Sequence, residues 1–289
     1  MRVAEGTRSV IGLLTRSPSV GSVISATLLA ARAWHLSPQF IHAGNASSPN
    51  ASFLWDQLGA QGVAPDRLQF LGEQNVTRTL LAHIRSVKPV LIVLGARPSE
   101  TAFRDLVGST ARRITLQAGA SVLLVSTRGR PPTHWRSVLV DVEYTVSGGK
   151  MAAFATDLAP HLHNDPHFIF AHQEPVYAHR GEQLPPFRWS VQTRGNLSPE
   201  AFQLANFVDG VRPEGGDVEA VILRGRLGET IAAFARDVES DLLVLRAPTR
   251  ALGVWSRLLS HPLMLAIAEL PCSVLLYREP KMSKSGGSK

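Results

Sequence analysis

Cysteine, long apolar runs and familiar catalytic motifs are scarce or missing in this sequence. The single cysteine, Cys272, excludes an internal disulfide, and its place at the start of an apolar run predicts a small buried side chain in a reducing compartment. No stretch of about 18 uncharged apolar residues occurs, so we predict no membrane span. The hydrophobic share of 44% and the charged share of 18% are those of an ordinary globular protein.

Sequence motifs of well-known enzyme classes are absent as well. The chain has no Walker loop, no Gly-x-Ser-x-Gly elbow and no Cys–His nucleophile pattern. We therefore expect no enzyme, or at most weak ATP hydrolysis, because phosphoryl transfer depends mainly on positioning and charge stabilisation. Residues 281–285 (KMSKS) match one signature of class I aminoacyl-tRNA synthetases, but the accompanying His-x-Gly-His is missing, and we interpret the match as chance.

The charge and the histidines raise two further classes of ligand. A net charge of +7 can indicate nucleic acid, but the arginines are spread along the chain with no dense run before the tail, so we do not predict this partner. Histidines concentrate at His161, His163, His167, His172 and His179. A zinc site normally needs a cysteine or carboxylate in a defined geometry as well, and we predict no metal.

Two segments read as one structural unit written twice. They are residues 91–125 (LIVLGARPSETAFRDLVGSTARRITLQAGASVLLV) and residues 242–277 (LLVLRAPTRALGVWSRLLSHPLMLAIAELPCSVLLY). Each runs from an apolar strand through a loop and an amphipathic helix to a second apolar strand. Self-similarity of this kind predicts two copies of one α/β unit.

Hydrophobic periodicity predicts the elements of both copies. In the first copy we expect strands at residues 9–15, 39–43, 68–71, 90–94 and 121–125, and helices at 20–34, 51–62, 75–87 and 101–118. In the second copy we expect strands at 137–143, 167–172, 217–223, 241–245 and 271–276, and helices at 151–162, 198–208 and 228–239. The long connection 173–216, with Tyr177, Phe187 and Trp189, is interpreted either as a docking surface or as a lid over the second sheet.

Alternating strands and helices indicate parallel pairing with right-handed crossovers. The predicted fold class is therefore α/β, with two tandem doubly wound parallel-sheet domains at residues 1–128 and 129–279, followed by a disordered basic tail at 280–289. Ligands of such sheets bind beyond the carboxyl ends of the strands.

The loop after strand 90–94 holds the residues most suited to a ligand. It reads Gly95-Ala96-Arg97-Pro98 and, nine residues later, Gly108-Ser109-Thr110. A glycine after a buried strand lets a ligand approach the backbone, and hydroxyls with free N–H groups at a helix start suit a phosphate. The same residues equally fit a plain turn at Gly95 and a helix cap at Ser109 or Thr110, so both interpretations stay open from the residues alone.

This loop resembles that of the universal stress protein family, whose nucleotide-binding members carry G-x2-G-x9-G-S/T after the fourth strand. Gly95, Gly108 and Ser109 match, and Pro98, which has no N–H, stands at the second glycine. The resemblance extends over both copies through the strand order and the closing strand PCSVLL at 271–276. It implies adenine-nucleotide α-hydrolase-like domains packed as a pseudo-dimer, in a cytoplasmic stress-response protein that is non-catalytic or weakly ATP-hydrolysing.

Departures from the family pattern limit what we expect to bind. ATP-binding members have an aspartate at the end of the first strand, where this chain has Thr15 in the first copy and Glu143, or else Asp141, in the second. In the second copy Arg246 and Thr249 replace the first two glycines, and residues 260–262 (SHP) replace Gly-Ser. The arginine would fill the space of a phosphate or bind an anion itself, and the second copy looks degenerate.

Two functions follow from this pattern. In the first, one ATP binds the first copy and biases the packing between copies and the recognition of a partner protein. The residues expected at that site are Thr15, Gly95, Arg97, Gly108, Ser109 and Thr110. In the second, both loops are degenerate and the chain is a nucleotide-free interaction scaffold. Either function is compatible with a homo-oligomer.

Overall fold

The structure, a computed structural model, describes residues 8–72, 74–96, 109–126, 130–175, 187–190, 198–213, 216–247 and 270–279. The strands are β1 (Ser9–Leu13), β2 (Ser37–Ala43), β3 (Leu68–Leu71), β4 (Leu91–Ala96), β5 (Ser121–Ser126), β6 (Ser137–Asp141), β7 (His167–Pro175), β8 (Phe187–Ser190), β9 (Asp217–Gly225), β10 (Leu242–Arg246) and β11 (Ser273–Tyr277). The α-helices are α1 (Val20–Ala33), α2 (Pro49–Gly59), α3 (Val76–Val87), α5 (Ser109–Gln117), α6 (Val146–Thr156), α7 (Pro199–Val211) and α8 (Glu229–Asp237).

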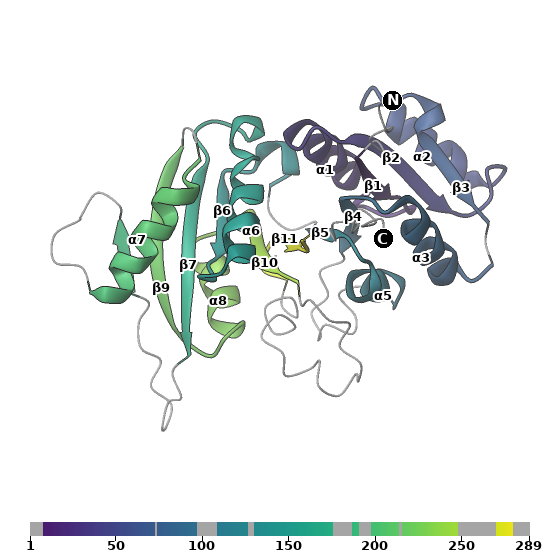
Figure 1. Cartoon of the computed structure of the whole chain (residues 1–289). Coiled ribbons are helices and arrows are strands. Elements are labelled where there is room, and N and C mark those ends of the chain that lie inside the picture. Colours follow the sequence, from purple (N-terminus) through teal and green to yellow (C-terminus); the bar gives the residue numbers. More distant parts are fainter. Residues whose placement is uncertain are drawn as a thin grey trace, which may run out of the picture.

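The strands in the described ranges form one sheet, in the order β3-β2-β1-β4-β5-β11-β10-β6-β7-β9-β8 (Figure 1). Neighbours pair in parallel except at β5–β11 and at β8–β9, which are antiparallel. We call β1 to β5 with their helices the first half and β6 to β11 with theirs the second half. The fold is α/β with a mostly parallel sheet, as predicted, while the domain boundaries at residues 128 and 279 stay predictions.

Central strands of the sheet are buried on both faces. In β4 the side chains of Leu91 and Val93 belong to one apolar cluster, and those of Ile92 and Leu94 belong to the other. The first cluster also includes residues of α1, α2, α6 and α7, and the second includes residues of α3, α5 and α8. This two-faced burial explains the continuous apolar runs of the sequence. Each cluster contains residues of both halves.

Polar contacts reinforce the antiparallel junction between the halves. The Ser121 hydroxyl accepts from the backbone N–H of Arg278 at 3.0 Å, and the Ser273 hydroxyl accepts from that of Ser126 at 3.2 Å. Beside the sheet, the ring of Trp34 stacks on that of Phe154 with centroids 3.9 Å apart, and Trp34 Nε1 donates to the Phe154 carbonyl at 2.9 Å. The end of α1 is thereby held against α6.

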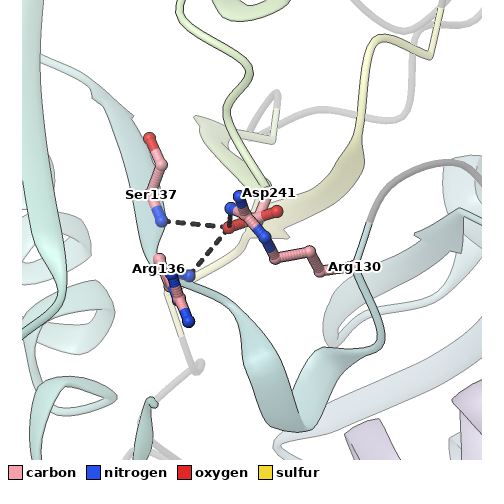
Figure 2. Close-up of polar contacts among 4 residues, drawn as sticks. All are labelled: Arg130, Arg136, Ser137 and Asp241. Atoms are coloured by element: carbon pink, nitrogen blue, oxygen red, sulfur yellow. Dashed lines mark hydrogen bonds and ion pairs between the residues drawn. The ribbon is translucent and has the colours of Figure 1, made fainter. Parts of the chain in front are cut away.

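A buried carboxylate fixes the start of the second half (Figure 2). Asp241, just before β10, accepts hydrogen bonds from the backbone N–H groups of Arg136 at 2.7 Å and Ser137 at 3.1 Å, and it also binds the Arg130 guanidinium at 3.2 Å. These contacts join the segment that leads into β6 to the amino end of β10. They lie at the opposite end of the strands from the predicted ligand edge.

Several element boundaries differ from the predictions. Helix α6 begins at Val146, five residues before the predicted start at 151, because the Thr145 hydroxyl caps it by accepting from Gly148 N at 3.0 Å. Strand β8 was not predicted and lies inside the connection 173–216, where it pairs with β9. The helix predicted at 101–118 is observed from Ser109, since residues 101–108 lie outside the described ranges, as does the tail 280–289. No helix in those ranges is long and apolar enough to span a membrane.

Candidate ligand site at the carboxyl edge of the sheet

The repeated sequence aligns residues 91–96 with 242–247, and strand register then shows which positions of the neighbouring strands correspond. Gly12 pairs with Val93 in the first half, and Val140 pairs with Val244 in the second. Continuing this register along each strand places Arg246 at the position of Gly95 and Glu143 at the position of Thr15. The sequence left Glu143 and Asp141 open as counterparts of Thr15, and the register selects Glu143.

Thr15 and Gly95 lie at the same edge of the first half. Thr15 is exposed, two residues beyond the end of β1, while Gly95 is half-buried in β4. A Cβ atom at Gly95 would lie 2.2 Å from Ser19 Oγ, just before α1. The Ser19 hydroxyl, which is 3.0 Å from that of Ser17, thus occupies the space that a side chain would take. Close packing of α1 on β4 is one physical reason for a glycine here.

The remaining predicted site residues belong to the loop and helix after β4. Ser109 is the first described residue of α5, and the Thr110 hydroxyl is 2.9 Å from the Thr77 hydroxyl of α3. Arg97 and Gly108 lie outside the described residues, as do Pro98, Thr249 and residues 260–262. Of the six predicted residues, the structure therefore places Thr15, Gly95, Ser109 and Thr110.

The corresponding edge of the second half carries an ion pair. The guanidinium of Arg246, at the end of β10, contacts the carboxylate of Glu143, which follows β6. Both side chains are partly buried, each 31% exposed, so solvent screens their attraction only in part. Arg246 therefore does fill this edge, and it does so together with an acidic partner.

A second polar chain lies beside that pair. Gln173 of β7 donates from Nε2 to Asp141 Oδ1 at 3.0 Å and accepts at Oε1 from the backbone N–H of Gly228 at 2.9 Å, at the start of α8. Burial raises the pKa of the Asp141 carboxyl to about 6; the Gln173 hydrogen bond opposes this shift, Glu143 adds to it and Arg246 opposes it. The sequence analysis missed Gln173, although its place directly after the apolar run of β7 marks it as an edge residue.

One histidine contact occurs in both halves. His42 Nδ1 lies 2.9 Å from the Leu14 carbonyl, and His172 Nδ1 lies 3.1 Å from the Val142 carbonyl, at corresponding positions of the two halves. In each case the ring nitrogen donates to the backbone just beyond the first strand. Among the described residues no three metal-ligating side chains come together.

Comparison of the whole structure identifies the class of fold, that of the universal stress proteins. A universal stress protein from Archaeoglobus fulgidus DSM 4304 is similar over 95% of this chain and 97% of its own, with a TM-score of 0.63 and 12% identity. A putative universal stress protein from Pseudomonas aeruginosa UCBPP-PA14 covers 94% of this chain and 93% of its own (TM-score 0.60, 15% identity). A functionally unknown protein from Pseudomonas aeruginosa PAO1 covers 94% and 92%, with the same score and identity.

No protein-family model matches the sequence, and no curated protein matches it. The chain therefore has the universal stress protein fold over nearly its whole length, at identities that establish the fold alone.

Proposed function

We propose that this protein is a stress-response regulator that binds at most one adenine nucleotide, ATP, at the carboxyl edge of its first half. The class of function is supported by the likeness of its fold to universal stress proteins. The absence of demanding catalytic motifs supports a non-catalytic role with at most weak ATP hydrolysis. The single, buried cysteine is consistent with a cytoplasmic protein, and a protein partner would sense the nucleotide.

One observation carries the proposal, the contrast between the two halves at four corresponding edge positions. These positions are Leu13, Thr15, Ala43 and Gly95 in the first half, and Asp141, Glu143, Gln173 and Arg246 in the second. A triphosphate carries several negative charges and needs space beside the backbone, so fixed carboxylates oppose its binding. The four positions of the first half carry no charge and include a glycine near the end of the central strand β4, so they favour nucleotide binding in the first half.

Four of the six candidate residues lie in the described part of that half. We expect the backbone N–H groups near Ser109 and Thr110, the first described residues of α5, to bind phosphate oxygens. Thr15 offers an exposed hydroxyl, and Gly95 leaves the end of β4 without a side chain. We expect Arg97 and Gly108 to complete the site.

Calorimetric titration of the full chain with ATP and with AMP tests this function. We expect one site per chain, and Gly95→Arg should weaken binding at least tenfold because it places the side chain of Arg246 at the corresponding position. Gly119→Arg is the matched control, since a Cβ there meets no atom within 4 Å. Circular dichroism must confirm folding of Gly95→Arg, whose new Cβ displaces the Ser19 hydroxyl. No heat of binding from the wild-type chain at millimolar nucleotide would refute the proposal.

The packing of Ser19 favours a second candidate, the nucleotide-free scaffold. Because the Ser19 hydroxyl already fills the space beside Gly95, that glycine has a structural reason that involves no ligand. A scaffold would retain the same partner protein with and without added ATP. Native mass spectrometry of the purified chain would then show no co-purified nucleotide and would also report its oligomeric state.

A further inference from the structure

We propose that the ion pair between Glu143 and Arg246 closes the second half to nucleotides and so limits the chain to one bound nucleotide. The inference rests on the proposed function, and it attributes the limit of one nucleotide per chain to the side chains of Glu143 and Arg246.

Space is the first argument. Arg246 stands where the first half has Gly95, so one of the largest side chains replaces the smallest at the end of the central strand. An arginine alone could turn away or pair with a phosphate. Here Glu143, just beyond the end of the neighbouring strand β6 and at the position of Thr15, holds the guanidinium across the edge. Glu143 and Arg246, which replace Thr15 and Gly95 of the first half, thus form an ion pair with each other. The pairing gives one structural reason for both replacements.

Charge is the second argument. Two carboxylates, Asp141 and Glu143, lie near the single guanidinium of Arg246, so the group has a net charge of −1 when both are ionised. A phosphate approaching this edge would be repelled rather than attracted. On the outer strands, Glu174 and Arg224 form a separate pair at 2.9 Å whose charges cancel.

Occupied backbone donors are the third argument. The N–H of Gly228, at the start of α8, is the kind of group that binds phosphate oxygens in α/β proteins. Gln173 Oε1 already accepts from it at 2.9 Å, and the same side chain donates to Asp141. The backbone N–H of Gly228 is therefore already hydrogen-bonded within the second half and is not available to a phosphate.

An opened variant tests the inference by counting nucleotides. Glu143→Thr with Arg246→Gly copies Thr15 and Gly95 into the second half of the full chain. Native mass spectrometry and calorimetry with ATP should then find one more nucleotide per chain than in the wild type. An unchanged count in the folded variant overturns the inference.

Failure of the proposed function gives a different result. If the wild-type chain binds no ATP but the opened variant binds one, the proposed function fails and the closing role of the pair stands. If the wild type binds one and the opened variant also binds one, only the inference fails. If neither binds, both fail.

A conservative variant covers the case in which the opened variant does not fold. Glu143→Gln keeps the size of the side chain but removes its charge, so the guanidinium of Arg246 is released and can pair with phosphate. We therefore expect an additional ATP site whose affinity falls with added salt. Absence of that site overturns the inference. The matched control is Glu174→Thr with Arg224→Gly, which removes the neighbouring ion pair. This control should leave the count unchanged, and a gain there equal to that of the opened variant also contradicts a specific role for Glu143 and Arg246.

Discussion

Asp141 has a carboxyl group whose surroundings favour the protonated form. Burial raises its pKa to about 6, whereas an aspartate in an unfolded chain titrates near 4. Between pH values of about 4 and about 6, Asp141 is therefore protonated in the folded state and ionised in the unfolded state. Through this window the stability contributed by the group falls as the pH rises, by at most about 3 kcal/mol.

Substitution by the amide isostere should remove this dependence. Asp141→Asn keeps an oxygen that can accept from Gln173 but carries no charge, so we expect its stability relative to the wild type to rise by about 2 kcal/mol from pH 4.5 to pH 7.5. Urea unfolding at the two pH values measures the difference. A stability difference that is the same at both values would contradict the assigned cause.

Helix α6 depends on two adjacent glycines in different ways. A Cβ at Gly148 would lie 2.0 Å from the Glu143 carbonyl oxygen, whereas a Cβ at Gly149 would meet nothing within 4 Å. We expect Gly148→Ala to destabilise the chain by about 2 kcal/mol, because the start of α6 must move away from the end of β6. Gly149→Ala should instead stabilise it by about 0.5–1 kcal/mol through helix propensity. Chemical denaturation of both variants checks the opposite signs, and equal effects would rule out the close contact as the cause.

Over the whole molecule, the halves share a sheet and two apolar clusters. We expect them to unfold together, and Trp34→Ala should lower the stability of both by about 3–5 kcal/mol, because it removes the ring stacked on Phe154 and its hydrogen bond. Differential scanning calorimetry should show a single transition that moves to lower temperature without splitting. Trp55→Ala is the control: Trp55 is 36% exposed and packs edge-on to Phe70 within the first half, so its loss should cost about 1–2 kcal/mol. Two separated transitions in the wild type would contradict this coupling.

The order of strands and helices could be predicted because local periodicity determines it. The strand predicted at residues 68–71 coincides with β3, and the helix predicted at residues 75–87 begins one residue before α3 and ends with it. Prediction was wrong where a contact from outside the element decides the boundary. Gly148 lowers helix propensity, yet it lies inside α6, since Thr145 caps the helix and only a glycine fits against the Glu143 carbonyl.

By itself, the sequence determined the class of fold and the residues present at each end of the parallel strands, because alternation of apolar runs with amphipathic helices depends on near neighbours in the chain. Only the tertiary structure decided that β5 meets β11 in antiparallel pairing, and that Glu143 faces Arg246 while Gln173 joins Asp141 to Gly228. These pairings connect residues far apart in sequence, and strand register, which no local pattern encodes, brings them to one edge.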